Sequence, residues 1–389
     1  MVDSASFTLI RGSARTAYAD FEKHAFELKR RIDRGSVFRL DSGSTEDIIA
    51  AIIGLDGHCK RIELVPEGVT PPASNGGSPA FRGPTEWVIY TSGTTGAPKA
   101  VVHTLQSLSR AVRPSDGSRV WGLVYDPHRL AGLAVLLQAM ASGSTLVEAR
   151  TGSIAERVVS MKSAGVTALS ATPTLWRQFL QSGAVRGWPL ERITLGGEVS
   201  DQRVLDALAS AFPSAHVTHI YAASETGVAF SVGDGKEGFP VTYLSSPPRG
   251  VRLEIRDDIL WVFSPESSLA GPDGFVRTDD VVEVKGDRVV FAGRKTGMVN
   301  VGGVKVYPEQ VEGVLRTHPS VSEAVVFPKS NPFSGNILLA RVTLVSPLEG
   351  AATEIRRWAQ SRLPPPMVPA QVVVVDELSS SATGKAVRA

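Results

Sequence analysis

Short apolar runs and amphipathic stretches alternate along the first 250 residues of the chain. Residues 87–90 (Trp-Val-Ile-Tyr) and 166–169 (Val-Thr-Ala-Leu) have the length and composition typical of strands. Residues 153–156 (Ser-Ile-Ala-Glu) form a capping-box sequence, and the stretch that they open ends at Gly165, which predicts an amphipathic helix. Another helix is predicted to begin at Pro173. Strands that alternate with helices in this way predict an α/β fold of layered sheets and helices.

The pattern changes near the end of this region. Two strand-like runs, 251–255 and 259–263, are joined by an Asp-Asp pair and predict a β-hairpin. Beyond Gly293, helix-like and strand-like segments follow one another over a length sufficient for a separate small α+β domain. We therefore expect a large N-terminal domain over residues 1–293 and a small C-terminal domain over residues 294–389.

Composition and charge narrow the class of protein. The 389 residues include 41 Lys plus Arg and 39 Asp plus Glu, a net charge of +2, which gives no sign of the basic face typical of nucleic-acid binders. The single cysteine, Cys59, excludes an intrachain disulfide and favours a reducing compartment. The longest apolar stretch, 131–141, is too short to span a membrane, and the N-terminus does not resemble a signal peptide. We expect a cytoplasmic protein that binds neither nucleic acid nor membrane.

One loop carries the strongest chemical signal. Residues 90–99 read Tyr-Thr-Ser-Gly-Thr-Thr-Gly-Ala-Pro-Lys, with strand-like runs on both sides. Glycines let backbone amides close round an anion, hydroxyls add donors, and the lysine adds charge, so this is a candidate phosphate loop. Its glycine spacing is not that of a Walker A loop. The candidate phosphate-binding residues are Thr91, Ser92, Gly93, Thr94, Thr95, Gly96 and Lys99.

Five further motifs follow this loop. They are Gly-Gly-Glu at 196–198, Tyr-Ala-Ala-Ser-Glu-Thr at 221–226, Gly-Phe-Val-Arg-Thr-Asp-Asp at 274–280, Gly-Arg at 293–294 followed by 301–309, and Thr-Gly-Lys at 383–385. With the loop, they resemble in the same order the signatures of the adenylate-forming superfamily of acyl- and aryl-CoA synthetases, nonribosomal adenylation domains and luciferases. The short region before the loop is similar to that of compact o-succinylbenzoate–CoA ligases. The resemblance implies a large adenylating domain and a small mobile C-terminal α+β domain.

The resemblance also implies what individual residues do. Glu225 would offer the hard oxygen that Mg²⁺ prefers, and Asp280 would accept hydrogen bonds from two ribose hydroxyls. Lys385 would bridge the substrate carboxylate and the α-phosphate and, with Glu225, form the catalytic pair. The remaining residues assigned to ATP or AMP are Gly197, Glu198, Tyr221 (packed on adenine), Ser224 and Arg294; Lys295 and Thr296 are assigned to the hinge, and Gly302 and Gly303 to the loop of the thioester step.

The sequence departs from the family pattern at the expected substrate pocket. Arg129 stands where many relatives carry an aromatic residue or a histidine that gates the carboxylate site. Either Arg129 binds an anionic group, such as a second carboxylate or an ATP phosphate, or it faces solvent and His128 is the gate. Ala222 and Ala223 would complete a pocket with room for an aromatic or branched acid.

Other departures lie nearer the nucleotide. Asp279 replaces the glycine that usually precedes the ribose aspartate and places an extra carboxylate there. His103 and His219 are expected to satisfy local polar or core positions and not to take part in chemistry.

The expected activity is a two-step ligation. ATP and Mg²⁺ would activate a small carboxylic acid to an acyl-adenylate with release of pyrophosphate, and a thiol, most commonly coenzyme A, would then accept the acyl group. Three alternatives stay open: loading of a carrier-protein phosphopantetheine arm, transfer to an amine, and a catalytically silent nucleotide-binding protein. The joint presence of Lys385, Glu225 and Asp280 favours an active enzyme.

Overall fold

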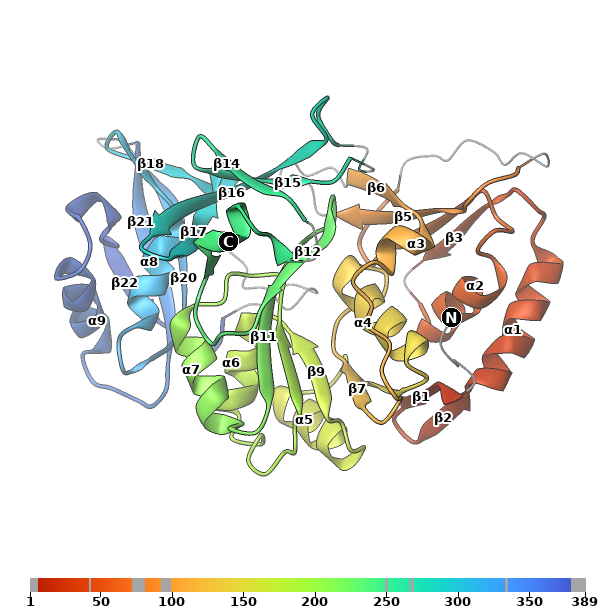
Figure 1. The fold of residues 1–389 in the computed structure, drawn as a ribbon. Coiled ribbons are helices and arrows are strands. Elements are labelled where there is room, and N and C mark those ends of the chain that lie inside the picture. The colour runs from red at the N-terminus through yellow and green to blue at the C-terminus, as the bar shows by residue number, and fades with distance from the viewer. Residues whose placement is uncertain are drawn as a thin grey trace.

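The protein is described here by a computed structural model, which covers residues 6–41, 43–71, 81–91, 99–248, 251–265, 267, 269–332 and 335–378. Within these residues the strands form sheets of eight, five, four, three and two strands. Helices and sheets alternate in layers, and the last part of the chain, in blue, gathers at one side of the molecule (Figure 1). The predicted α/β class with layered sheets is confirmed.

The eight-stranded sheet is the framework of the large N-terminal part. Its order is β12-β11-β10-β9-β7-β8-β1-β2; the strands from β11 to β1 pair in parallel, and β12 and β2 pair antiparallel at the two edges. The strands are β1 (Thr8–Arg11), β2 (Ala14–Ala17), β7 (Val120–Leu123), β8 (Thr145–Glu148), β9 (Ala168–Ala171), β10 (Arg192–Leu195), β11 (His216–Ala223) and β12 (Gly227–Val232). Parallel strands place their carboxyl ends at one edge, where ligands of α/β sheets bind.

Helices cover both faces of this sheet, and side-chain caps start the three on one of these faces. Ser153 and Glu156 bond reciprocally to each other's backbone N–H, which is the predicted capping box. Thr172 and Asp201 cap the next two helices with their side-chain oxygens. The helices are α4 (Leu130–Ala141) on one face, and α5 (Ile154–Ser163), α6 (Pro173–Gln181) and α7 (Gln202–Ala211) on the other.

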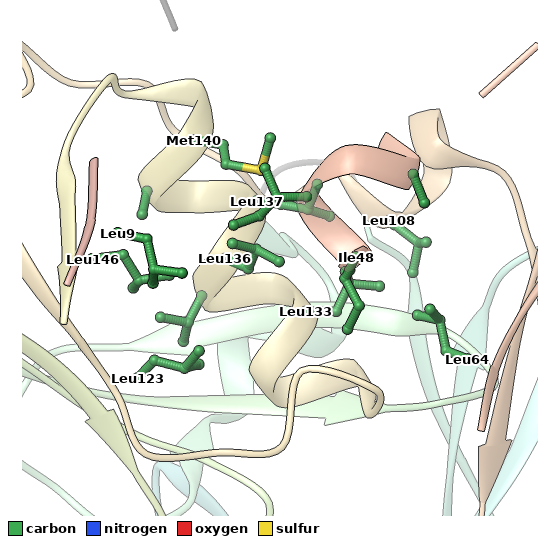
Figure 2. Packing of buried hydrophobic residues seen from close by; sticks show 14 of the residues in the cluster. Leu9, Ile48, Leu64, Leu108, Leu123, Leu133, Leu136, Leu137, Met140 and Leu146 are labelled. Carbon is green, nitrogen blue, oxygen red and sulfur yellow. The ribbon is translucent and has the colours of Figure 1, made fainter. Parts of the chain in front are cut away.

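A smaller sheet with its own helices lies over the α4 face. Its strands are β3 (Val37–Asp41), β4 (Arg61–Val65), β5 (Glu86–Thr91) and β6 (Lys99–His103), and its helices are α1 (Tyr18–Arg31), α2 (Thr45–Gly54) and α3 (Leu105–Leu108). Leu133 and Leu136 of α4 pack between Leu146 of β8 and Ile48 of α2 (Figure 2). The apolar stretch of α4 is therefore core, and no helix among the described residues is long and apolar enough to cross a membrane.

A five-stranded antiparallel sheet completes the large part. Its strands are β13 (Phe239–Pro240), β14 (Leu253–Arg256), β15 (Ile259–Phe263), β16 (Phe275–Lys285) and β17 (Arg288–Arg294), with the 3₁₀ turn η2 (Val241–Leu244) beside them. Strands β14 and β15 form the predicted hairpin. Asp257 and Asp258 join them with φ of 49° and 61°, the left-handed pair that a two-residue turn between twisted strands requires.

The chain beyond β17 has a hydrophobic core of its own. Its elements are η4 (Lys295–Gly297), β18 (Val299–Val301), β19 (Val304–Val306), α8 (Pro308–Arg316), β20 (Val321–Asn331), β21 (Gly335–Leu344), α9 (Ala351–Gln360), η5 (Pro365–Met367) and β22 (Gln371–Val374). Val311 of α8, Val326 of β20 and Ile355 of α9 are fully buried in this core. The domain boundary between residues 293 and 294 stays a prediction.

A ring of four charges joins the two parts of the chain. Arg177 of α6 binds Asp201 at 2.6 Å and Glu323 of β20 at 2.9 Å, and Arg316 of α8 binds the same two carboxylates at 3.0 Å each. Each of the four side chains is less than one fifth exposed. Burial raises the pKa of Asp201, but the two arginines outweigh it, so the net shift is downward and the carboxylate stays charged.

Candidate active site

A cavity of about 460 Å³ runs along β10 and β11 and reaches past their carboxyl ends. Its walls come from the ends of β5 and β6, from α4, from the eight-stranded sheet and from the β16–β17 region. The predicted site residues that line it are Thr91, Lys99, Arg129, Gly197, Ala222, Ala223, Ser224, Glu225, Arg294 and Thr296. Residues from distant parts of the sequence are thus brought to one space.

The two ends of the candidate phosphate loop lie on the cavity wall. Thr91 ends β5 and Lys99 begins β6, and the two are register partners in this antiparallel pair. A loop that joins them starts and finishes beside the cavity. The expected residues Ser92, Gly93, Thr94, Thr95 and Gly96 fall outside the described residues, as does Lys385.

His103 supports the wall that carries Glu225. Its Nε2 lies 2.7 Å from the carbonyl oxygen of Ser224, and its Nδ1 lies 3.4 Å from the Ser107 hydroxyl. Burial lowers the pKa of His103, which favours a neutral ring that donates from Nε2 and accepts at Nδ1. The histidine satisfies local polar groups, as predicted, but one of those groups belongs to the 221–226 motif itself.

Asp280 lies just behind the cavity wall, with 8% of its surface exposed. The Tyr221 hydroxyl donates to its Oδ2 at 2.5 Å, and Arg294 Nε donates to its Oδ1 at 3.0 Å. Burial and the Asp280 charge raise the pKa of Tyr221, so the phenol stays protonated and remains a donor. A carboxylate has about four lone-pair sites, and these two bonds leave acceptor capacity on Asp280. Its neighbour Asp279 is on the cavity wall.

Tyr221 lies in an aromatic cluster and not among the residues that line the cavity. The rings of Phe230 and Phe291 lie nearly parallel to the Tyr221 ring, each with its centroid 5.3 Å away. For Tyr221 to pack on adenine, as the family resemblance implies, part of this cluster would have to move. The hydrogen bond that the structure shows for the Tyr221 hydroxyl is the one to Asp280.

The two residues of the Gly-Glu motif diverge. Gly197 lines the cavity with φ of 83°, a left-handed conformation that glycine adopts without a steric penalty. The Glu198 carboxylate turns away and accepts a hydrogen bond from the backbone N–H of Thr174 at 3.0 Å. There it meets the N-terminus of α6, where negative charge is favourable. The structure therefore places Glu198 at a helix end and not on the cavity wall.

The structure separates the two candidates for the substrate gate. Arg129 lines the cavity at the N-terminus of α4, with 20% of its side chain exposed. Its buried Nε has no hydrogen-bond partner within the described residues, and the closest carboxylate oxygen, on Asp126, is 3.8 Å away. His128 is 2% exposed, binds Asp126 through Nδ1 at 2.9 Å and does not line the cavity. Arg129 is thus the residue that a ligand in this cavity would meet.

The expected hinge and thioester-step residues lie at different distances from the cavity. Thr296 of η4 is on its wall, whereas its neighbour Lys295 is not. Gly302 and Gly303 form the exposed turn between β18 and β19, with φ of 58° and 88°, and neither lines the cavity. This arrangement does not bring the turn to the site.

The charged residues at the carboxyl end of the cavity fit a nucleotide with bound magnesium. Lys99 and Arg294 supply positive charge for phosphates, and the Glu225 carboxylate accepts no hydrogen bond within the described part of the chain. Magnesium is usually held by one or two carboxylates together with phosphate oxygens and water. Glu225 alone is therefore an adequate protein ligand.

Sequence reasoning missed the residues at the opposite end of the cavity. Arg119, Trp121 and Arg192 line it near the amino ends of β7 and β10. None belongs to a recognisable motif, and only the strand register places Trp121 and Arg192 in one row, through Ala168 between them. The signal available in the sequence was the alternation of Arg192, Thr194 and Gly196 along one strand.

Comparison with known families identifies the chain. Residues 69–260 match the model of the family described as AMP-binding enzyme, and residues 310–385 match that of the AMP-binding enzyme C-terminal domain. The two matches together cover more than half of the sequence. The chain belongs to the AMP-binding enzymes. The predicted membership of the adenylate-forming superfamily is confirmed.

Named relatives of this AMP-binding enzyme differ in length. The 4-chlorobenzoate–CoA ligase of Arthrobacter sp. is 27% identical over 93% of the chain and 76% of the ligase. A dimodular nonribosomal peptide synthase of Bacillus subtilis (strain 168) is 26% identical over 77% of the chain, which spans only 14% of that synthase. The structure of o-succinylbenzoate CoA synthetase from Bacillus subtilis, in complex with its acyl-adenylate intermediate, superposes with a TM-score of 0.71 at 17% identity over 98% of this chain and 94% of that one, which establishes the shared fold.

Proposed function

We propose that this AMP-binding enzyme is an AMP-forming acid–thiol ligase. It activates a carboxylic acid with ATP to an acyl-adenylate, releases pyrophosphate and transfers the acyl group to coenzyme A. One observation carries the proposal. Lys99, Glu225 and Arg294 line the same cavity as residues of the eight-stranded sheet, so a nucleotide and an acid share one space. The similarity to a named CoA ligase over 93% of the chain supports it.

The first step joins a carboxylate oxygen to the α-phosphorus while the bond to pyrophosphate breaks. Lys99 and Arg129 provide positive charge where two anions must approach, and Thr91 adds a hydroxyl donor at the loop end. Lys385, outside the described residues, is proposed to counter charge at the reacting centre. When bound, Mg²⁺ would neutralise phosphate charge, with Glu225 as its protein ligand. Positioning and electrostatics account for most of the rate in such transfers.

The Asp280 carboxylate is proposed as the ribose site. Tyr221 and Arg294 hold it in one orientation by donating to different oxygens, and the remaining lone pairs can accept from ribose hydroxyls. Arg294 spans the gap, because it bonds Asp280 and also lines the cavity. Tyr221 therefore positions Asp280 whether or not its ring meets the base.

The transfer step is proposed to need a second arrangement of the chain. In the arrangement described here, the turn of Gly302 and Gly303 does not line the cavity. A rotation about Lys295 and Thr296, next to the site, would take Lys385 away from the site and bring the turn of Gly302 and Gly303 to it.

Pyrophosphate exchange into ATP tests the first half of the proposal. The full chain is assayed with a panel of aryl, short-chain, long-chain, dicarboxylic and amino acids. Exchange that depends on one class of acid, and is lost in Glu225→Gln, is the expected result. Saturable ATP binding without exchange on any acid would contradict the proposal and would indicate a nucleotide-binding protein without this activity. The adenylate is then incubated with coenzyme A, a carrier protein or an amine, and chromatography of the products identifies the acceptor.

A further inference from the structure

The cavity follows one face of the eight-stranded sheet along the direction of strands β10 and β11. On β10 the residues that line it are Arg192, Thr194 and, just beyond the strand, Gly196, which is every second residue and therefore one face. The same alternation holds for Thr218, Ile220 and Ala222 of β11, and the last residue of that strand, Ala223, lines the cavity as well. The four residue steps from Arg192 to Gly196 correspond to roughly 13 Å of strand. A ligand that reaches from one end to the other is therefore long.

The two ends of the cavity have different chemistry. The carboxyl end holds Lys99, Glu225 and Arg294, where the nucleotide is proposed to bind. The amino end, at the start of β7 and β10, holds Arg119 and Arg192 on its wall. Between them the sheet offers hydroxyl groups and α4 offers its small apolar face. The cavity thus has one polar and one apolar side, and cationic groups at both ends.

Two buried donors at the amino end have no acceptor in the part of the chain that the structure describes. The Nε of Arg119 and the Nε1 of Trp121 are buried, and neither has a hydrogen-bond partner within the described residues. Trp121 is 7% exposed, so bulk water does not serve its indole N–H. Within the described chain, Arg119 has one carboxylate oxygen within 4 Å, on Glu191, and it lies 3.9 Å from Nε. The Glu191 side chain is 63% exposed. Buried polar groups in proteins are nearly always paired, so these donors point to a ligand acceptor.

Arg113, also on the cavity wall, is differently placed. Its Nη1 donates to the carbonyl oxygens of Arg110 and Val112, which fixes the guanidinium to its own loop. It therefore serves as a matched control for Arg119: both are arginines on the same wall, and only one has an unpaired buried Nε.

We propose that the acid substrate carries a second anionic group, about 13 Å from the carboxyl group that is activated. Arg119 and the indole N–H of Trp121 bind this group at the amino end of β7, beside the positive charge of Arg192. The substrate class is accordingly a long dicarboxylic acid or another extended acid with a terminal anion. This inference rests on the ligase activity proposed above, in which the other carboxyl group reacts at the nucleotide end.

The test compares acids that differ only at the far end. Straight-chain dicarboxylic acids from adipic to dodecanedioic acid are assayed by pyrophosphate exchange, each against the monocarboxylic acid of the same carbon number and against its monomethyl ester. The expected result is a lower KM for the longer diacids than for both partners. Equal KM values across each set would overturn the inference and leave the ligase activity standing.

Variants locate the second site. Arg119→Gln is expected to raise the KM for the preferred diacid by about tenfold or more, as for loss of a charge-assisted hydrogen bond, and to leave the monoacid unchanged. Trp121→Phe, which keeps an aromatic side chain of smaller size and removes the indole N–H, is expected to raise the KM for the diacid by less. Arg113→Gln leaves it unchanged. Equal losses on diacid and monoacid in Arg119→Gln, with an unchanged melting temperature, would contradict the site.

A binding measurement separates this inference from the ligase activity. If no acid supports exchange, calorimetric titration of the diacids into the full chain still measures binding at the amino end of the cavity. Binding that Arg119→Gln weakens and Arg113→Gln does not would sustain the second anion site while the ligase proposal falls. Absence of diacid binding would overturn both.

Discussion

At the scale of single residues, the site depends on one buried carboxylate. Asp280 receives its hydrogen bonds from Tyr221 and Arg294, and it is almost excluded from water. A buried acceptor that loses a donor keeps its desolvation cost, which makes Tyr221 important for folding as well as for the nucleotide.

Replacement of Tyr221 by Phe tests this dependence. The variant keeps the ring and removes the donor, so we expect it to lower the free energy of unfolding by about 1–3 kcal/mol, measured by urea denaturation. Tyr243→Phe is the control, because Tyr243 packs edge-on against Phe230 of the same aromatic cluster and its hydroxyl makes only a 3.4 Å contact with the Ser231 carbonyl. Equal losses in the two variants would show that packing, and not the bond to Asp280, is the source.

Arg129 gives a second prediction. It lies at the N-terminus of α4 near the carboxyl end of β7, beside the proposed reaction centre. Arg129→Gln is expected to lower kcat/KM in pyrophosphate exchange by about tenfold or more for monoacids and diacids alike, because the group that it meets is common to both. A loss confined to diacids would move the second anion from Arg119 to Arg129.

Motifs located residues well where the backbone itself reaches the cavity, and less well where side-chain direction decides. The small residues Ala222, Ala223 and Ser224 line the cavity, and Glu225 follows them onto its wall. Glu198 belongs to an equally clear motif, but the free N–H groups of α6 compete for its carboxylate. Arg119 has no motif, and its place is set by the pairing of β7 with strands distant in sequence.

At the scale of elements, α4 shows how a helix start positions the site. A Cβ atom added to Gly132 in its first turn would lie 2.3 Å from the carbonyl oxygen of Asp126 and 2.8 Å from Pro127 Cα. Both are backbone atoms, so the segment that carries Arg129 can approach the helix only because residue 132 is glycine.

Two glycine replacements of opposite sign test this contact. Gly132→Ala is expected to cost about 1–3 kcal/mol of unfolding free energy and to raise the KM for the acid, since the displaced segment includes Arg129. Gly313→Ala in the middle of α8, where an added Cβ would meet nothing within 4 Å, is expected to add about 0.5–1 kcal/mol. Differential scanning calorimetry measures both. A stable Gly132→Ala would contradict the close approach.

Local sequence predicted several elements of this fold, because the groups that start or end them lie close together in the chain. The capping box of α5, the proline at the start of α6 and the Asp-Asp turn each satisfy groups within a few residues. The order of strands in the eight-stranded sheet was not predictable. It places β1 beside β8, and that pairing depends on burial of Leu9 against Leu146, far along the chain.

At the scale of the whole molecule, the ring of Arg177, Asp201, Arg316 and Glu323 holds the small C-terminal part against α6 and α7. Arg316→Gln leaves two buried carboxylates with half of their partners, and we expect a loss of roughly 3 kcal/mol in urea denaturation at neutral pH. Arg256→Gln is the control, because its two carboxylate partners are nearly half exposed and solvent screens these ion pairs, so the expected loss is much smaller.

The same ring predicts a pH dependence. Burial raises the pKa of Glu323 and of Asp201, but Arg177 and Arg316 bring the net shift of both below the ordinary carboxyl values. Stabilisation by a group with a lowered pKa is complete above its unfolded value, near 4, and is lost as pH falls through the folded value. The difference between the parent chain and Arg316→Gln should therefore shrink in acid. A difference that is constant from pH 7 to pH 3 would contradict the assignment.

The cavity along the sheet face also has a kinetic consequence. Lys99 is exposed at its nucleotide end, and one third of the Arg119 side chain is exposed at the other, so both ends of the space lie near the protein surface. An acid that enters past Arg119 does not cross the path of the triphosphate. Neither reactant then blocks the other, and initial-rate plots with acid and ATP varied together should show random, not compulsory, order of addition.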